Sequence, residues 1–434
     1  MRQPRIVLLC CLAALFAGAD LATASGFGLF QHGGRAIGQV GALTARADEP
    51  SAVTYNPAAI VRLEGLQAQA GLDFNNSDDE YKSSTGSFSA AHIIQFLPAL
   101  YATWKPGDGP WALGLGLDSP FWYRVDWQPV FFPGRFLNRT FEVRIYEVHP
   151  VLAYDLGDGW SVGGGVRYLF GSLEQGDNTR VSVFTAPGVP SPLIEVERTA
   201  EADVDAISWD LAVHYAATAW GWGAVYRGNA ELKGSGDVSY DPRDIPAGDP
   251  AIDAALRARF GAGGSARQAF ELPRELRGGI WVAPYPELRI ELDASWQSWS
   301  SLENPDVTYN PNAFGDGPTV TTRRDWEDTL GLRLGLEGDI TDQVVLFGGV
   351  AMEPSPVPDS TVETGFPRGD ALVYGIGASY NFPNISFDVA YSLHQHDKRG
   401  GQPQELLNPG VRGTYSTNDP VFGFSVRWRP GEDR

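Results

Sequence analysis

The residue types that most often carry catalysis are few and scattered in this chain. Six histidines occur among 434 residues, and none has the spacing of a shared metal site. The sequence also lacks the nucleophile motif Gly-x-Ser-x-Gly. His149 and His214 are expected to face inward from strands, so a Ser–His lipase is conceivable, but spacing places no serine beside them. We therefore expect no catalytic residue, no cofactor and no metal, and a protein that is not an enzyme.

A dense aromatic group between residues 119 and 139 favours the binding of apolar molecules instead. The group consists of Phe121, Trp122, Tyr123, Trp127, Phe131, Phe132 and Phe136. If these side chains lie on an exposed loop, they form a surface that can capture a hydrophobic ligand. The alternative is a loop that packs on itself or contacts a membrane girdle.

An amphipathic helix is the second candidate wall of a ligand groove. Residues 249–260 place Ile252, Leu256 and Phe260 on one face at helical spacing. Such a helix either lines a groove for the ligand or stabilises the loop that contains it. The sequence does not choose between these two roles.

Several arginines are candidates for binding an anionic group of a ligand. They are Arg167, Arg227, Arg277, Arg289 and Arg333, with Arg167, Arg277 and Arg289 as the leading three. An arginine in a partly dry pocket can hold a carboxylate through two parallel hydrogen bonds. The alternative for each is an ion pair with a nearby acid, such as Asp210, Glu275, Glu291 or Asp388.

The first 24 residues have the three parts of a secretory signal peptide. Two arginines precede an apolar stretch, which ends at the small-residue cleavage site Ala22-Thr23-Ala24. The stretch is too short to anchor the chain as a membrane-spanning helix. Both cysteines, Cys10 and Cys11, lie in this leader. The mature chain is therefore expected to have no disulfide and no reactive thiol.

Charge and hydropathy exclude two further classes of protein. The formal net charge is −20, which makes nucleic acid a poor partner because its affinity comes mainly from Lys and Arg on phosphates. After the leader, no apolar run approaches the ~20 residues of a membrane-spanning helix. A helical membrane protein and a nucleic-acid-binding protein are both disfavoured.

After residue 65, apolar and polar residues alternate with a period of two in fourteen short segments, which predicts strands with one apolar face. The segments are residues 66–74, 96–104, 111–117, 146–154, 162–170, 207–215, 220–226, 276–282, 288–296, 330–336, 344–351, 372–380, 385–393 and 422–428. Only residues 344–351 are apolar on both faces, so their facing cannot be assigned from the sequence.

The distribution of aromatic and charged residues predicts that these strands form a membrane barrel. Apolar faces commonly end in Trp, Tyr or Phe, where aromatic girdles would lie. Charges such as Arg289, Glu291 and Asp293 gather on the opposite face, which suits a wet lumen. Long and short connections also alternate, as in bacterial outer-membrane barrels. We expect an all-β, 14-stranded antiparallel transmembrane β-barrel with both termini in the periplasm.

The stretch before the strands does not alternate and carries a resemblance to a known family. Residues 25–60 read SGFGLFQHGGRAIGQVGALTARADEPSAVTYNPAAI, with a Gly-rich middle and the closing motif Asn56-Pro57-Ala58. They resemble the amino terminus of the FadL/TodX family of outer-membrane transporters for hydrophobic compounds. The segments GIWVA (279–283), DASWQSWS (293–300) and SPVPDSTV (355–362) are similar to later parts of that family.

The resemblance implies an organisation and a mechanism. It implies a signal peptide (1–24), an N-terminal hatch in the lumen (25–65), a barrel (66–428) and a periplasmic tail (429–434). Family members capture a hydrophobic molecule at outer loops, bind it in the lumen and release it past the hatch, in part sideways through a kinked strand. Long-chain fatty acids and aromatic hydrocarbons are the expected ligands, transported passively across the outer membrane of a Gram-negative bacterium.

Further expectations concern the kink, the partners and the end of the chain. Gly114 and Gly116 in the third strand lack bulk and weaken pairing, so an inward kink is expected there. We expect a monomer in contact with outer-membrane lipid and lipopolysaccharide. Unlike family members that end on an aromatic residue, this chain continues beyond Trp428.

Two other readings remain open from the sequence. One is a general porin or ion-selective channel, although an open pore needs no hatch. The other is an outer-membrane enzyme or adhesin, for which no residue pattern speaks. Uptake of small sugars without uptake of a hydrophobic compound would favour the channel.

Overall fold

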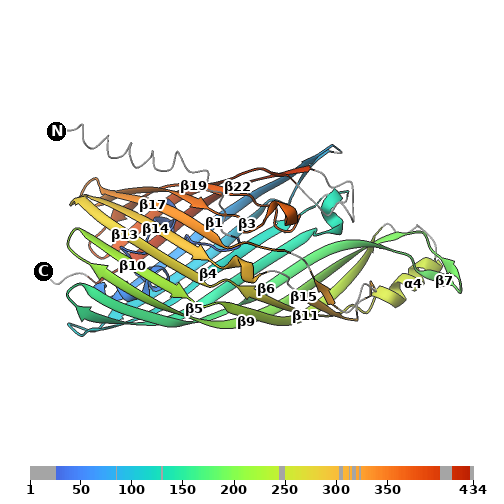
Figure 1. The fold of residues 1–434 in the computed structure, drawn as a ribbon, viewed down its shortest axis with the longest axis horizontal. Helices are drawn as coiled ribbons and strands as arrows, with labels where there is room; N and C mark the ends of the chain where they lie inside the picture. Colours follow the sequence, from blue (N-terminus) through green and yellow to red (C-terminus); the bar gives the residue numbers. More distant parts are fainter. Residues whose placement is uncertain are drawn as a thin grey trace.

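The computed structural model of the chain shows a closed β-barrel with a long extension at one end (Figure 1). It describes residues 26–84, 86–128, 131–243, 250–302, 306–311, 313–314, 319–321, 324–400 and 413–430. Within these ranges, fourteen antiparallel barrel strands form a single sheet, and pairing of the first with the last closes it. The predicted all-β fold and its strand number are thus confirmed. The predicted signal peptide lies outside the described residues.

Eleven barrel strands are continuous, and three consist of two pieces. The continuous strands are β1 (Gly65–Ser83), β3 (Ile93–Lys105), β4 (Trp111–Asp126), β5 (Thr140–Gly157), β6 (Trp160–Val181), β9 (Ile194–Ala216), β17 (Thr329–Asp339), β18 (Val344–Glu353), β19 (Ala371–Asn381), β20 (Ile385–His396) and β22 (Gly413–Trp428). The divided strands are β10 (Trp220–Arg227) with β11 (Ala230–Arg243), β12 (Gly264–Leu272) with β13 (Glu275–Tyr285), and β14 (Leu288–Gln297) with β15 (Asp306–Asn310).

The remaining elements are short. They are the strands β2 (Gly86–Ser89), β7 (Phe184–Ala186), β8 (Val189–Pro190), β16 (Thr319–Thr321) and β21 (Arg399–Gly400), the helices α2 (Gly34–Gly38), α3 (Ala52–Tyr55) and α4 (Pro250–Phe260), and the 3₁₀ turns η1 (Pro57–Arg62), η2 (Pro133–Phe136), η3 (Trp299–Ser301) and η4 (Asp359–Thr361). In the described part of the chain, none of the helices has the length and apolarity required to cross a membrane.

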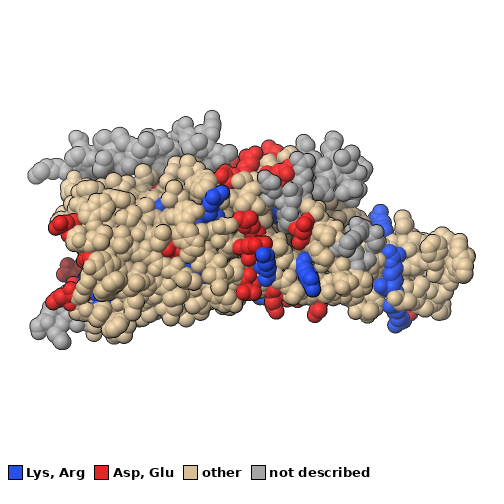
Figure 2. Space-filling model, turned by 60° about the horizontal axis from the view of Figure 1, so that its bottom comes forward, with Lys and Arg blue, Asp and Glu red and all other residues tan. Residues whose placement is uncertain are grey.

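The outer face of the barrel has a broad band that is poor in charge (Figure 2). Apolar side chains of the predicted outward sets are exposed there, as Leu100 (50%) and Ile376 (66%) illustrate. The alternation also settles the facing of β18, because Leu346 is 49% exposed whereas Phe347 is 3% exposed. An apolar exterior is the surface that a lipid bilayer requires.

Several strands continue far beyond this band into the extension (Figure 1). β6 and β9 pair without interruption from Trp160↔Tyr215 to Val181↔Ile194. Most of residues 174–201, which fall in the long connection between the predicted strands 162–170 and 207–215, are therefore strand. The period-two pattern did not predict this continuation of the strands. Alternate side chains are buried here against α4, in a separate apolar cluster, rather than against lipid.

The wall of the barrel has a gap between β3 and β4. These strands pair only from Leu100↔Leu117 to Trp104↔Leu113 among the described residues. The chain just before β3 contacts the end of β4 again, where the Ala91 N–H donates to the Asp126 carbonyl at 2.7 Å. Between these points the strands separate, and the pairing of β4 with β5 shifts register between Asp118 and Phe121.

Residues 26–63, called the inner segment below, lie inside the barrel. Nearly all of their side chains are buried against inward-facing strand residues. The expectation of a wet lumen is therefore wrong at this level, since carboxylates such as Glu291 and Asp293 meet inner-segment backbone rather than water. The sequence could not distinguish the two, because both put charge on the inward face.

Candidate functional site

The amino-terminal end of the inner segment inserts one aromatic ring into a cage of other aromatic rings. Phe27 is 1% exposed. Six rings have centroids 4.8–5.9 Å from the Phe27 ring, and they belong to Tyr123, Phe141, Phe270, Trp299, Trp326 and Phe366. These residues, called the aromatic cage below, come from distant parts of the chain. A phenyl group held only by apolar contacts shows what kind of group the cage accepts.

The backbone beside Phe27 fills the wall gap. The Leu29 N–H donates to the Pro120 carbonyl at 2.8 Å, and the Trp122 N–H donates to the Phe27 carbonyl at 3.3 Å. Gly28 thereby forms an antiparallel bridge with Phe121. Three residues of the inner segment thus act as a short extra strand on the edge of β4 that β3 leaves open.

The backbone conformation and the Trp299 ring restrict position 26 to glycine. Its φ of +62° is unfavourable for other residues, and a Cβ there would lie 2.5 Å from the Trp299 ring. The sequence therefore needs a glycine directly before the caged phenylalanine.

A cavity of about 50 Å³ lies beside the cage and directly behind the gap. Leu97 of β3 and Trp122 of β4 bound it on the two sides of the gap. Its apolar wall includes Phe27, Phe30 and Phe366, whereas its polar wall consists of Gln31, Asn75, Glu353, Arg368, His394, His396 and Asp419. An apolar cavity that holds benzene is about 150 Å³, so a ligand ring fits only if Phe27 leaves.

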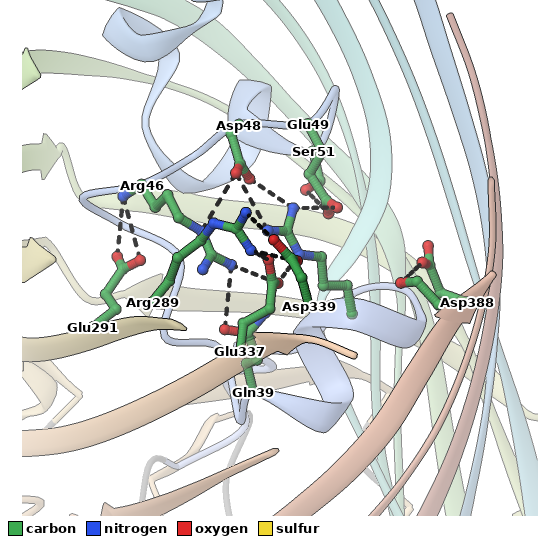
Figure 3. A network of polar contacts seen from close by, with 12 residues as sticks. Gln39, Arg46, Asp48, Glu49, Ser51, Arg289, Glu291, Glu337, Asp339 and Asp388 are labelled. Carbon is green, nitrogen blue, oxygen red and sulfur yellow. Dashed lines mark hydrogen bonds and ion pairs between the residues drawn. The ribbon is translucent and has the colours of Figure 1, made fainter. Parts of the chain in front are cut away.

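The carboxyl-terminal half of the inner segment is held by ionic contacts instead (Figure 3). Glu337 of β17 lies 2.8 Å from Arg35 and 2.9 Å from Arg46. Arg35 also contacts Asp48 at 2.6 Å and Glu49 at 3.1 Å. Removing one partner of such a buried network leaves a charge uncompensated, which is strongly destabilising.

Inward-facing carboxylates also bind the backbone of this half. The Ala45 N–H donates to Glu291 at 2.6 Å, and the Thr44 N–H donates to Asp293 at 2.9 Å. The inner segment is thereby fixed to β14 through its main chain.

The motif Asn56-Pro57-Ala58 lies where the inner segment turns toward β1. The Asn56 side chain accepts from the Ala58 N–H at 3.1 Å and donates to the Thr44 carbonyl at 2.9 Å. Pro57 begins η1, where its missing N–H costs nothing. The motif therefore caps a turn and ties it to the rest of the segment.

His32 is the buried titratable group nearest the boundary between the two halves. Burial lowers its pKa, because the imidazolium would lose its hydration there. Its backbone N–H donates to the Tyr55 hydroxyl at 3.0 Å. The histidine is thus neutral in the inserted segment.

The structure places most of the predicted aromatic group inside the protein. Phe121 (7%), Tyr123 (1%), Trp127 (0%) and Phe132 (0%) are buried, whereas Phe131 is 78% exposed. The expectation of an exposed surface is wrong for these four. Phe121 and Tyr123 belong to β4, which continues to Asp126 and turns alternate residues into the lumen, and the Trp127 ring stacks on that of Phe132. Trp122 lies at the gap and packs against Tyr146. Their role in ligand binding remains a prediction.

The predicted helix is present as α4, but its apolar face is covered. Ile252, Leu256 and Phe260 are 4%, 1% and 2% exposed and belong to the core of the extension. The exposed apolar side chains of the extension lie instead around the hairpin β7–β8: Phe184 (69%), Val189 (52%) and Leu193 (69%). These three are new candidates for ligand capture.

The predicted basic residues each meet an acid. Arg167 pairs with Glu147, Arg277 with Glu275 at 2.9 Å, and Arg289 with Asp339 at 2.8 Å. Arg227 and Arg333 likewise contact Glu275 and Glu353. Each of the five arginines is thus in an ion pair, which is the alternative that the sequence left open.

Gly114 and Gly116 lie in the regularly paired part of β4, just before its register shift. A Cβ at Gly114 would lie 2.7 Å from Val53, and one at Gly116 would lie 3.0 Å from the same residue. The glycines therefore admit the inner segment against the wall. A role in a kink remains a prediction.

Sequence reasoning missed the residues that matter most here. Phe27, Trp299, Trp326 and Phe366 form or fill the cage, yet they are spread over more than 300 positions. Only Gly26-Phe27 carried a signal, as the Gly-Phe start of the family-like stretch. The described residues contain no group of three His, Cys, Asp or Glu arranged for a metal.

Comparisons with known proteins agree with this architecture. A family model described as outer membrane protein transport protein (OMPP1/FadL/TodX) matches residues 15–429. A search of curated proteins found no match. Among solved structures, a Pseudomonas aeruginosa FadL homologue is similar with a TM-score of 0.80 and 21% identity, covering 93% of this chain and 99% of its own.

Two further structures share the fold. The Pseudomonas putida toluene transporter TodX has a TM-score of 0.70 and 14% identity, and covers 93% of this chain and 100% of its own. The Ralstonia pickettii toluene transporter TbuX has a TM-score of 0.67 and 18% identity, and covers 92% and 99%. Because the family model spans nearly the whole chain, this protein belongs to the OMPP1/FadL/TodX family of outer-membrane transport proteins.

Proposed function

We propose that this protein transports long-chain fatty acids or related hydrophobic compounds passively across the outer membrane. The observation that carries the proposal is the caged Phe27 ring beside a cavity that lies directly behind a gap in the wall. Family membership supports transport, and the toluene transporters of similar fold support a hydrophobic ligand.

The exposed apolar residues of the extension suggest the first step. The hairpin β7–β8, around which Phe184 and Leu193 are exposed, lies at the far end of the extension, where a molecule leaving the medium would first meet the protein (Figure 1). From there the ligand would enter the lumen and reach the aromatic cage. No energy source is needed, because each apolar contact replaces water.

Displacement of Phe27 is the gating step that we propose. A ligand ring in the cage and the Phe27 ring exclude each other, since the cavity beside them is only about 50 Å³. When Phe27 leaves, the two hydrogen bonds between residues 27–29 and β4 break, and the gap loses its lining. The ligand then leaves sideways into the bilayer.

The packing of the lumen argues against a general porin. Residues such as Ala36, Ala45 and Ala58 of the inner segment are completely buried. The ionic and backbone contacts described above hold this segment to several strands. A water-filled path is not expected while it stays in place.

Uptake by whole cells tests the proposal. Gram-negative cells expressing the chain and cells with an empty vector are given labelled oleate, toluene or a small sugar. We expect faster uptake of at least one hydrophobic compound and no change for the sugar. Faster sugar uptake without faster uptake of either hydrophobic compound would overturn the proposal.

A further inference from the structure

Among the described residues, a single arginine lines the cavity, and an acid matches its charge. Arg368 lies 2.7 Å from Asp419 and donates to the Ser77 hydroxyl at 2.7 Å. Asp419 also lies 3.2 Å from His396. A carboxylate ligand would have to break this pair to gain an arginine, so the pair disfavours it.

The balance of acidic and basic side chains around the cavity also disfavours a carboxylate ligand. Among the described residues that line the cavity, two acids, Glu353 and Asp419, face one arginine, Arg368. Asp79 also lies close to the cavity, beside Thr417. An anion entering the lumen would meet more acidic than basic groups, in surroundings where charges interact strongly.

Some neutral side chains on the polar wall of the cavity, in contrast, have polar atoms without a hydrogen-bond partner among the described residues. The Gln31 Nε2 and Asn75 Oδ1 atoms are buried and have no hydrogen-bond partner among the residues that the structure describes, and neither has His394 Nε2. Gln31 and Asn75 are 8% and 6% exposed. One amide atom of each is bonded: Gln31 Oε1 accepts from Ser392 at 3.1 Å, and Asn75 Nδ2 donates to Gln95 at 3.3 Å.

These groups offer a donor and an acceptor to one small polar group of a ligand. A buried polar atom without a partner costs stability, which a ligand can restore. The same cavity is apolar on its other wall through Phe30 and Phe366. The site therefore suits a molecule that is mostly apolar but carries one uncharged polar group.

We propose that the preferred ligand is an uncharged hydrophobic molecule with one hydrogen-bonding oxygen, such as a phenol, an alcohol or a ketone, rather than a carboxylate. The inference rests on the proposed transport function. It narrows the substrates from fatty acids and related hydrophobic compounds to the uncharged compounds among them. Gln31 and Asn75 would bind the oxygen, and the aromatic cage would bind the apolar body after Phe27 leaves.

Three probes of equal shape separate charge from hydrogen bonding. p-Xylene has no oxygen, p-cresol has a hydroxyl and p-toluate has a carboxylate on the same ring. Calorimetric titration of the full protein in lipid nanodiscs at pH 7.5 measures their affinities. We expect p-cresol to bind about three- to tenfold more tightly than p-xylene, the effect of a neutral hydrogen bond, and p-toluate not to bind detectably.

Two variants test the assigned residues. Gln31→Leu combined with Asn75→Leu should abolish the preference for p-cresol over p-xylene, measured as the ratio of the two affinities. Asp419→Asn should release Arg368 and permit p-toluate binding, a gain of about tenfold or more for a charged hydrogen bond. Retained p-xylene binding shows in each case that the variant is folded.

Failure of this inference differs from failure of the proposed function. Equal affinities for p-cresol and p-xylene, or wild-type binding of p-toluate as tight as that of p-cresol, would overturn the inference. The inference would also be overturned if the Asp419→Asn variant binds p-xylene but does not bind p-toluate. If cells expressing the chain take up neither oleate, nor toluene, nor any of the three probes faster than control cells, the proposed function itself fails.

Discussion

The two halves of the inner segment are held in the barrel by different physics. Residues 26–30 are held by aromatic contacts and by two backbone hydrogen bonds to β4. Residues 35–59 are held by buried ion pairs and by carboxylates that accept from their backbone. An apolar ligand can replace the first kind of contact but not the second.

This difference indicates which part can move. A hydrophobic molecule in the aromatic cage offers the cage the same contacts that Phe27 offers, so the exchange costs little. It offers nothing to Arg35, Arg46 or Glu337. We therefore expect the amino-terminal end to move while the ionic half stays in place.

The largest expected effect is that of Glu337→Ala on the ionic half. The change leaves Arg35 and Arg46 without their shared partner, at a cost of about 3–5 kcal/mol for a broken buried pair. Liposome swelling should show a leak of small sugars. Asp339→Asn is the matched control, because Asp339 is 32% exposed and such pairs contribute less than about 1 kcal/mol. Equal leakage of the two variants would contradict the ranking.

Phe27→Ala should have the next largest effect, on the apolar half. Loss of the caged ring should cost about 3 kcal/mol of docking energy, as in large-to-small core substitutions. Uptake of p-xylene should become faster, and limited proteolysis should remove residues before Phe30 while sparing the ionic half. Phe27→Leu keeps part of the apolar contact and should have a weaker effect. Unchanged uptake in both variants would show that Phe27 does not close the path.

The smallest expected effect is a pH dependence of closure through His32. Its pKa is lowered in the inserted segment, whereas a released segment would have an ordinary value of about 6.5. At higher pH both forms are neutral and closure is complete. Below about pH 6.5 only the released form gains a proton, so closure weakens by up to about tenfold per pH unit.

His32→Gln provides the control for the pH measurement. The charged groups that act most strongly on His32 are Asp118, Arg227, Glu147 and Arg277. They are unchanged in this variant. Uptake of p-xylene between pH 8 and pH 5 should rise in the wild type and stay flat in the variant. Parallel profiles would assign the pH dependence to other groups.

The barrel could be predicted from the sequence because lipid imposes a pattern on every strand. Outward residues such as Leu100 and Ile376 must be apolar, and the period of two reports this directly. The extension obeys the same period for a different reason, since its alternate residues pack on α4. The sequence predicts loops at these strands because their outward residues are polar.

The contacts of the inner segment could not be predicted in the same way. Glu291 binds the Ala45 N–H across 246 positions of sequence, and no local pattern reports such a pairing. The aromatic stretch after Pro120 has the pattern of an exposed surface, because nothing in that pattern reports that a distant residue, Phe27, covers it. Charge on the inward face indicated a polar lumen but not what fills it.

Two disulfide locks compare the two halves directly, using the absence of cysteine from residues 25–434. Gly28→Cys with Phe121→Cys joins the bridged pair at the gap, where directly opposite residues without mutual hydrogen bonds have the short Cα separation that a disulfide needs. Val53→Cys with Gly116→Cys joins the ionic half to β4, where a Cβ at residue 116 lies 3.0 Å from a Val53 methyl carbon.

Uptake of p-xylene by cells expressing each locked protein, before and after reduction, is the most direct test of the central claim. We expect the lock between residues 28 and 121 to stop uptake and a reductant to restore it. The lock between residues 53 and 116 should leave uptake at the wild-type rate. Equal uptake by both oxidised proteins, or loss of uptake only in the second, would contradict the conclusion that the apolar end is the part that moves.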